Sequence, residues 1–293
     1  MWLIVGTVPH EDFPLTFGVS RMEGDHLYVG EQRVSVDRGT AALAAAAWLT
    51  CATYHETGAA PQECCVPHLL LVGDTGDGKG SRAVYAWLVE NLVTLAAQPS
   101  ALCGLTFHYL FPDVDWHNRV LMSIEMLARK PLLVADAGFM YVAKMSGYAD
   151  AYDLFTPDVG EMAFLADENA PHPFYTRGFL LATENDIPTL LTRAHSHGNC
   201  AQNLIVKGAK DYVVQGANIL DTVDSPAVEA MEAIGGTGDI VTGIVTGLLA
   251  LGLPMREACL KAVRTSRLLA HMAAPDPATQ VGELLRMAYF ERL

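Results

Sequence analysis

The chain has 293 residues, of which 51% are hydrophobic, enough for a large buried core, so disorder is not expected. Its 33 acidic and 19 basic residues give a formal net charge of −14. Because neutralising phosphates requires clustered Lys and Arg, this balance argues against a general nucleic-acid-binding role. An acidic enzyme can still bind a nucleotide through local N–H groups, one or two Lys and Mg²⁺. We therefore expect a small-molecule substrate as the partner.

The cysteines and the apolar runs indicate a cytoplasmic protein. The cysteines are Cys51, Cys64, Cys65, Cys103, Cys200 and Cys259. None forms a Cys-x-x-Cys pair, and in a long chain without a secretory leader reduced thiols are expected. The most apolar stretch, Ile240 to Pro254, contains three glycines and is shorter than the roughly 20 residues of a membrane span. No membrane partner is therefore expected.

The first 57 residues predict a strand, a hairpin and a core helix. Trp2 to Val5 is a short apolar strand candidate, and Gly18 to Val36 alternates as hairpin strands do around Glu23-Gly24-Asp25. Thr40 to Tyr54 is rich in Ala, Leu and Trp. Helices of that composition usually pack from several sides, so this one is expected inside the fold.

From residue 68 onward, strands and helices alternate. We expect strands at 68–72, 103–109, 131–135, 152–155 and 203–206, a strand pair across 211–221, and helices at 81–97, 117–129, 138–147, 159–166, 186–197, 239–252, 255–273 and 280–290. Such alternation predicts a mostly parallel central sheet with helices on both faces. The whole chain, 1–293, is expected to form a single α/β domain, with an N-terminal part at 1–57 and a core at 66–275.

One candidate phosphate-binding loop lies early in the chain. Gly73-Asp74-Thr75-Gly76-Asp77-Gly78-Lys79 follows an apolar strand and precedes a helix, which is nearly a Walker A pattern. In that motif a Ser or Thr follows the Lys and binds Mg²⁺, whereas here Gly80 takes its place and Ser81 comes one residue late. Asp74 and Asp77 would also bring negative charge against a polyphosphate. A P-loop NTPase therefore stays open only as an alternative.

A second glycine-rich loop lies in the segment Glu232 to Ile244, where Gly235-Gly236-Thr237-Gly238-Asp239 precedes an apolar helix. The first N–H groups of a helix lack intrahelical partners and its dipole is positive there, so the loop suits a phosphate. A carboxylate beside a phosphate repels it, so Asp239 is better placed to take a proton from an attacking hydroxyl. The plain alternative is a tight turn whose Asp caps the helix.

These residues resemble the ribokinase-like superfamily, whose Gly-Thr-Gly-Asp or Gly-Ala-Gly-Asp loop forms an anion hole with a catalytic Asp. The stretch from Gly235 to Cys259 is most similar to the NAD(P)H-hydrate dehydratase branch, often labelled carbohydrate kinase. In the same order as in the superfamily, the chain has an apolar strand ending on Asp at 131–137, Thr-Pro-Asp-Val-Gly-Glu at 156–161 and Lys-Gly at 207–208. The likeness covers roughly residues 66 to 275.

The resemblance implies a role for each of these positions. Asp239 would be the catalytic base, with Gly236, Thr237 and Gly238 holding the transferring phosphoryl group. The cofactors would be ATP (or ADP) and Mg²⁺. The remaining implied residues are Glu161 and Asp158 for Mg²⁺, Lys207, Gly208 and Gly235 beside the nucleotide, and Asp74, Asp77, Lys79 and Asp136 facing the acceptor substrate.

Two segments depart from the dehydratase pattern. Asp158-Val159 stands where the dehydratases carry His-Pro before Gly-Glu, and Ser225 to Glu232 replaces an Asn-rich segment. The main hypothesis is therefore a carbohydrate-like kinase acting on a hydroxyl of a small metabolite. An ATP/ADP-dependent NAD(P)H-hydrate dehydratase is the alternative, and a non-catalytic nucleotide-binding protein a weaker one.

The remaining candidates carry less weight. His108 and His172 could line a cleft or serve as structural residues, and His195 and His197 lack metal-ligand spacing. Glu125, Glu229 and Glu232 are most simply solvated carboxylates. Members of the superfamily are commonly dimers or tetramers, so a homo-oligomer is expected, with the edge of the 18–36 hairpin as the place to look for the partner.

Overall fold

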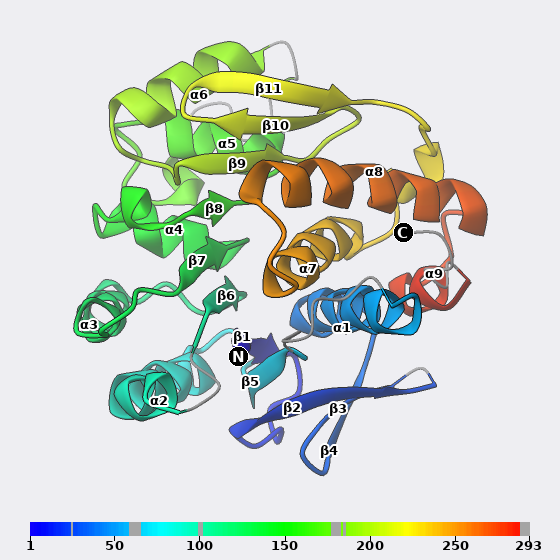
Figure 1. Ribbon diagram of the computed structural model, residues 1–293. Coiled ribbons are helices and arrows are strands. Elements are labelled where there is room, and N and C mark those ends of the chain that lie inside the picture. Colours follow the sequence, from blue (N-terminus) through cyan, green and yellow to red (C-terminus); the bar gives the residue numbers. More distant parts are fainter. Residues whose placement is uncertain (25, 59–65, 99–101, 177–182, 184–185, 288–293) are drawn as a thin grey trace.

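A computed structural model describes residues 1–24, 26–58, 66–98, 102–176, 183 and 186–287. Its strands form one 11-stranded sheet in the order β11-β10-β9-β8-β7-β6-β1-β5-β2-β3-β4 (Figure 1). The centre is parallel, from β9 through β8, β7, β6 and β1 to β5. These strands are β1 (Trp2–Val8), β5 (His68–Gly73), β6 (Gly104–His108), β7 (Leu132–Ala135), β8 (Leu154–Phe155) and β9 (Asn203–Val206). The predicted mostly parallel sheet is confirmed.

Antiparallel strands extend the sheet at both ends. At one end, β10 (Asp211–Gln215) and β11 (Asn218–Val223) form the predicted strand pair. At the other end, β2 (Thr16–Glu23), β3 (His26–Val29) and β4 (Gln32–Ser35) form a meander that pairs with β5 through β2. The expected hairpin at 18–36 therefore consists of three strands, because a second turn, at Gly30, adds β4 after β3.

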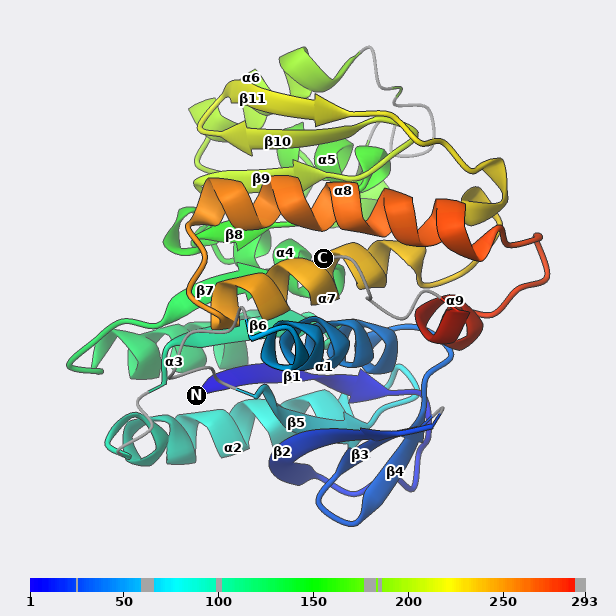
Figure 2. The ribbon, with the colours of Figure 1, turned by 45° about the vertical axis from the view of Figure 1, so that its right-hand side comes forward.

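Helices cover both faces of the sheet (Figures 1 and 2). One face carries α1 (Thr40–Glu56), α7 (Thr237–Ala250), α8 (Met255–Ala273) and α9 (Val281–Met287). The other carries α2 (Lys79–Ala96), α3 (Val114–Glu125), α4 (Gly138–Met145), α5 (Val159–Ala166) and α6 (Ile187–Ser196). Side chains of β1 alternate between the two cores: Trp2 and Ile4 join the first, Leu3 and Val5 the second.

Helices α1 and α7 pack against each other at very short distance. A Cβ at Gly243 would sit 2.3 Å from the carbonyl oxygen of Leu43, and one at Gly247 would sit 2.8 Å from the Cβ of Thr50. Only glycine permits this approach. The Ala-rich α1 is buried on nearly all sides, as predicted from its composition. This packing fixes the first turns of α1 and α7 relative to each other.

Several element boundaries differ from the prediction for local reasons. Helix α3 begins at Val114 rather than at 117, because the side chain of Asp113 caps it by accepting from the N–H of Trp116. Helix α7 begins at Thr237, so Asp239 lies in its first turn. The strand expected at 152–155 is reduced to β8 at 154–155. The last helix ends at 287 in the described chain, and 288–290 lie outside it.

No helix in the described part of the chain combines the length and hydropathy that crossing a bilayer requires. The thiols of Cys200 and Cys259 are buried, and burial raises the pKa of each to about 12. Their protonated form makes them unreactive. Cys64 and Cys65 lie outside the described residues.

Candidate active site

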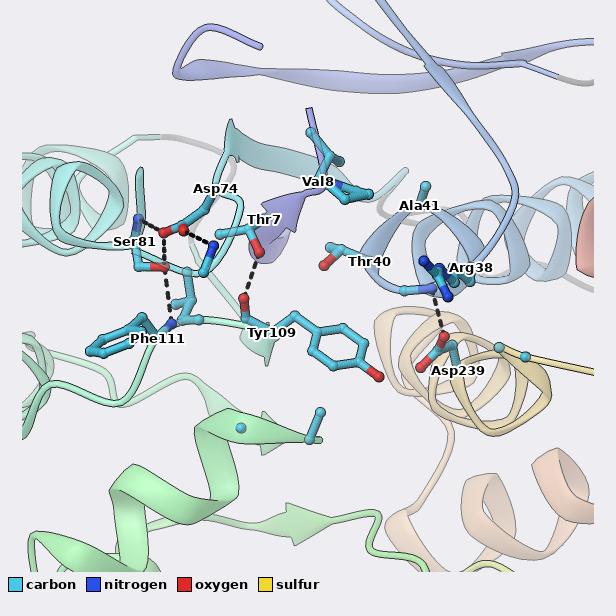
Figure 3. A pocket seen from close by; sticks show the side chains of 18 of the residues that line it. Thr7, Val8, Arg38, Thr40, Ala41, Asp74, Ser81, Tyr109, Phe111 and Asp239 are labelled. Atoms are coloured by element: carbon cyan, nitrogen blue, oxygen red, sulfur yellow. Dashed lines mark hydrogen bonds between the residues drawn. The ribbon is translucent and has the colours of Figure 1, made fainter. Parts of the chain in front are cut away.

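A cavity of about 1660 Å³ lies at the carboxyl ends of the parallel strands. In such sheets this edge is where ligands bind, because successive loops meet there. The lining residues come from the end of β1, the link between β4 and α1, the turns after β5, β6 and β7, and the loop before α7. Figure 3 shows Tyr109 lying between the Asp74–Ser81 end of this cavity and Asp239.

The Gly-Gly-Thr-Gly-Asp loop borders this cavity through three of its residues. Gly235, Gly236 and Asp239 line it, and Gly236 takes a left-handed backbone conformation (φ 96°) as the residue before α7. The first bond within the helix is donated by the N–H of Ile240 to the carbonyl oxygen of Gly236, at 3.3 Å. The N–H groups of Thr237 and Gly238 precede that bond, at the positive end of the helix dipole.

The carboxylate of Asp239 is bound by groups from outside its own loop. Its Oδ2 accepts the N–H of Gly39, at the start of α1, over 2.7 Å, and its Oδ1 lies 3.0 Å from Nε2 of His108. Burial alone would raise the pKa of Asp239, but His108, Lys207 and the Gly39 N–H outweigh it and hold this pKa below its usual value. Asp239 is therefore an ionised, fixed carboxylate at the edge of the cavity.

Behind Asp239 lies a buried ion pair. Nζ of Lys207 is 3.0 Å from both oxygens of Asp136, and the Thr242 hydroxyl donates to Asp136 over 2.6 Å. Burial lowers the pKa of Lys207, but Asp136 and Glu161 together raise it above its ordinary value. A Cβ at Gly238 would lie 3.3 Å from Nζ of Lys207. Lys207 thus places its charge directly beneath the loop at 235–239. Neither Lys207 nor the buried Asp136 is among the residues that line the cavity.

His108, Asp136 and Asp239 offer ligand atoms within 4.8 Å of one another. Two observations argue against a metal there. Both oxygens of Asp136 already bind the ammonium of Lys207, and Nε2 of His108 already binds Asp239. The group is therefore a network of hydrogen bonds that includes the Lys207 ammonium.

The two residues expected to organise Mg²⁺ form a capping box at α5. The Asp158 side chain accepts the N–H of Glu161 over 2.7 Å, and Glu161 accepts the N–H of Asp158 over 2.9 Å. The Tyr141 hydroxyl donates to Glu161 over 2.9 Å. Glu161 lines the cavity, and burial raises its pKa to about 8. Glu161 is therefore a buried acceptor whose burial is not fully compensated by positive charge, and a cation would suit it. Asp158 does not line the cavity.

The Lys207-Gly208 turn is held by a second buried ion pair. The N–H of Gly208 donates to Asp211 over 3.1 Å, and Nε of Arg267 in α8 donates to the same carboxylate over 2.7 Å. Arg267 also donates to the carbonyl oxygen of Gly208 over 3.1 Å. Helix α8 therefore fixes the turn that was expected to border a nucleotide.

In the other glycine-rich loop, at 73–79, a carboxylate of the loop itself binds the backbone N–H groups. The carboxylate of Asp74 accepts the N–H groups of Gly76 at 2.8 Å, Gly78 at 3.2 Å and Ser81 at 2.8 Å, as well as the Ser81 hydroxyl at 2.7 Å. These N–H groups are the ones a P-loop would offer to a phosphate. The start of α2 is therefore already neutralised by the chain itself, which argues against a P-loop NTPase.

The other predicted residues lie at different places. Asp74 lines the cavity, whereas Asp77 and Lys79 form an exposed ion pair at 2.7 Å outside its lining. His172 lines the cavity, and the ring of His108 lies buried beneath Asp239. His195 and His197 are not among the residues with clustered metal-ligand atoms in the described chain.

Sequence reasoning missed the partners that the link before α1 supplies. Gly39, Arg38 and Thr40 line the cavity, and only the fold brings Gly39 against Asp239, 200 positions away. Tyr109 was missed too; it has a positive φ of 48°, a strained conformation for a bulky residue and one that often marks a functional site. No short-range spacing in the sequence links these positions to the glycine-rich loop.

Comparison with solved structures identifies the fold class. The chain is similar to a ribokinase-like superfamily protein of Enterococcus faecalis (12% identity, TM-score 0.55, covering 99% of this chain and 85% of the other). It is also similar to Escherichia coli phosphofructokinase-2 in its tetrameric form (11%, TM-score 0.53, 99% and 98%) and to the ADP complex of Bacillus subtilis pyridoxal kinase (15%, TM-score 0.52, 90% of each). The fold is ribokinase-like.

Sequence comparison identifies the family. The family model for NAD(P)H-hydrate dehydratases, labelled carbohydrate kinase, matches residues 115–287, which is more than half of the chain. An uncharacterized protein of Methanocaldococcus jannaschii is 36% identical over 221 residues, covering 74% of this chain and 87% of the relative. The chain belongs to this carbohydrate kinase (NAD(P)H-hydrate dehydratase) family. The prediction of a ribokinase-like kinase or dehydratase enzyme is confirmed.

Proposed function

We propose that the protein transfers the terminal phosphoryl group of MgATP to a hydroxyl of a small metabolite. The observation that supports this most is the position of Asp239: a buried, ionised carboxylate that lines the same cavity as Gly235 and Gly236 and is bound by Gly39 and His108, which lie outside that loop. A carboxylate so placed can accept a proton beside a phosphate without occupying the phosphate's site. ADP as the donor is the alternative.

The reaction follows from this arrangement. Asp239 takes the proton of the acceptor hydroxyl while its oxygen attacks the terminal phosphorus and the bond from that phosphorus to the leaving nucleotide breaks. The N–H groups of Gly236, Thr237 and Gly238 hold the transferring group, and Lys207 beneath Gly238 offsets its developing charge. In this proposal Gly208 and Gly235 border the nucleotide and Asp74 faces the acceptor; of these, Gly235 and Asp74 line the cavity.

Glu161, with Asp158 as the residue that orients it, would hold Mg²⁺ through water. The fit rests on Glu161 being a buried carboxylate at the cavity with a raised pKa of about 8. The cation would neutralise the donor phosphates when bound. Within the chain, the Tyr141 hydroxyl fixes the Glu161 carboxylate so that it keeps facing the cavity.

The family match favours a second outcome of the same chemistry. A dehydratase would phosphorylate the hydroxyl of a hydrated nicotinamide and then eliminate phosphate, restoring the reduced nicotinamide. The matched segment 115–287 contains Asp239, Glu161 and Lys207, which both outcomes use. The two differ in whether phosphate stays on the product, so one assay separates them.

We would incubate the purified protein with MgATP, and separately with MgADP, against hydrated NADH and a panel of sugars, pyrimidine alcohols and vitamins. A phosphorylated product would establish the kinase. Recovery of the reduced-nicotinamide absorbance with stoichiometric free phosphate would establish the dehydratase. Nucleotide binding without turnover on any acceptor, in wild type and Asp239→Asn alike, would instead support a non-catalytic nucleotide-binding protein.

We also propose that the protein is a cytoplasmic homo-oligomer whose subunits meet along the outer edge of β4. This strand ends the 11-stranded sheet, so its outer N–H and C=O groups are available for pairing with a second copy. Phosphofructokinase-2, with the same fold, is described as tetrameric. Light scattering of wild type and of an Arg33→Pro variant, at an exposed position of β4, would test this, because proline removes a strand donor.

A further inference from the structure

His108 links two helices through one buried ring. It ends β6 with no exposed surface, and its Nε2 lies 3.0 Å from Oδ1 of Asp239 at the start of α7. Its Nδ1 lies 3.1 Å from the hydroxyl of Thr40 at the start of α1. A buried histidine whose two nitrogens both have partners has a fixed ring orientation, so Oδ1 of Asp239 is fixed with it.

The chain keeps space for this contact in the middle of the sheet. A Cβ at Gly6 in β1 would lie 2.5 Å from the Thr40 hydroxyl and 2.4 Å from the carbonyl oxygen of His108. Any other residue there would push Thr40 away from the ring. A threonine hydroxyl can donate to Nδ1, and in that arrangement the Nε2–H donates to Asp239.

The groups around Asp239 explain why one more donor matters. Gly39 of α1 holds Oδ2, and Lys207 is bound to Asp136. The Asp136 carboxylate lies 4.0 Å from Nε2 of His108, the Tyr109 ring packs against the His108 ring, and Glu161 lines the same cavity. Three carboxylates thus share one buried ammonium. The His108 bond gives Asp239 a donor of its own.

We propose that His108 is a positioning residue that holds Oδ1 of Asp239 so that the remaining oxygen lone pairs face the acceptor hydroxyl, with Thr40 fixing the ring. The proposal rests on the proposed phosphoryl transfer. During the reaction the hydroxyl proton moves to Asp239 as the new O–P bond forms and the bond to the leaving nucleotide breaks. His108 keeps its own proton throughout.

The test compares His108→Leu, which removes the donor, with His108→Gln, whose amide N–H can donate from a similar position. The control is His117→Gln. His117 is also buried, but it binds the Tyr152 hydroxyl at 2.9 Å on the other face of the sheet. We expect His108→Leu to lower kcat about 10- to 100-fold, with the KM for the nucleotide little changed. His108→Gln should recover most of this loss, and His117→Gln should keep the wild-type kcat.

The pH profile separates positioning from a purely structural role. Without the His108 bond, the burial of Asp239 is less compensated, so its pKa should rise and the acid limb of kcat/KM should move to higher pH in His108→Leu. In His108→Gln and His117→Gln the limb should stay close to its wild-type position. A loss of kcat in His108→Leu without movement of this limb would overturn the proposal.

A measurement independent of turnover keeps this inference distinct from the proposed function. Protein labelled with ¹³C at the Asp carboxylates would be titrated by NMR, with Asp239→Asn to assign the signal. If wild type shows no turnover and the Asp239 pKa still rises in His108→Leu, the positioning role would be supported and the phosphoryl transfer refuted. An Asp239 pKa equal to that of wild type would overturn the positioning role. If His108→Leu does not fold, Thr40→Val, which frees the ring, should shift the same signal in the same direction by less.

Discussion

Two helix starts in this chain look alike in sequence and differ in chemistry. Both α2 and α7 follow a glycine-rich turn with an Asp, and both are preceded by a glycine in the left-handed conformation, Gly78 at φ 76° and Gly236 at φ 96°. At α2 the Asp74 carboxylate folds back onto the N–H groups of its own turn. At α7 the Asp239 carboxylate instead binds the N–H of Gly39 and Nε2 of His108.

The difference decides which loop can hold a phosphate. N–H groups already bound to a carboxylate cannot neutralise a second anion, and the carboxylate repels it. The partners of Asp239 come from the start of α1 and from β6, so the proposed anion site at α7 depends on the fold as well as on the motif. Motif spacing in both loops is compatible with phosphate, and the hydrogen-bond partners of the two carboxylates distinguish them.

The largest effect should come from replacing Asp239. Asp239→Asn keeps the size of the side chain but removes the base, so kcat should fall roughly 10²- to 10⁴-fold while the Kd for MgATP changes little. Turnover by product analysis and binding by calorimetry would measure both. The comparison variant is Lys79→Ala, whose ammonium is exposed outside the cavity lining. If Lys79→Ala abolished nucleotide binding while Asp239→Asn remained active, the roles of the two loops would be reversed.

The two N-cap glycines allow a matched test. Alanine at either position is strained by the positive φ, at a cost of about 1–2 kcal/mol in the free energy of unfolding. At Gly236 the new Cβ would also lie 3.1 Å from Cα and Cβ of Arg38 at the cavity, and at Gly78 it would lie 2.8 Å from the Phe111 ring. Both variants should lose stability in chemical denaturation. Gly236→Ala should additionally lose about 10-fold or more in kcat, and an equal kcat loss in Gly78→Ala would contradict the contrast.

Whether a structural feature can be predicted from the sequence depends on how close along the chain the residues that form it lie. The alternation of strands and helices predicts the parallel sheet, and Ala-rich 40–54 predicts a buried helix, because these patterns are set by neighbouring residues. A phosphate-binding role for the loop at 235–239 was predicted from its own residues and from the family resemblance. The contacts of Gly39 and His108 with Asp239 were not predicted, because they join residues 200 and 131 positions apart. The same limit explains why the buried Asp136 was expected to face a substrate.

A third helix start, at α5, extends the comparison, because there a capping box occupies Asp158 while Glu161 also faces the cavity. Burial raises the pKa of Glu161 to about 8, above its unfolded value of about 4.3, so the folded state binds more protons between these values. This group therefore lowers stability as pH rises from about 4.3 to about 8.

Glu161→Gln removes that penalty. Without Mg²⁺ the variant should melt at a higher temperature than wild type at pH 8, with the difference shrinking toward pH 5. Adding Mg²⁺ with nucleotide should stabilise wild type more than the variant, because only the carboxylate gains a cation. Thermal melts at several pH values, with and without Mg²⁺, measure both effects. A variant stabilised by Mg²⁺ and nucleotide as much as wild type would exclude Glu161 as a residue that holds the cation.

The smallest effect is expected for the contribution of Asp74 to stability. Burial would raise the pKa of Asp74, but the Ser81, Gly76 and Gly78 bonds together hold it below its usual value. The stabilisation by its carboxylate is therefore present above the unfolded pKa of about 3.9 and is lost as pH falls through the lower folded value. Asp74→Asn should be less stable than wild type at pH 7, and the two should converge in acid. Urea unfolding at pH 7 and pH 3 would show this, and a difference that persists unchanged at pH 3 would mean that the carboxylate charge is not what neutralises the start of α2.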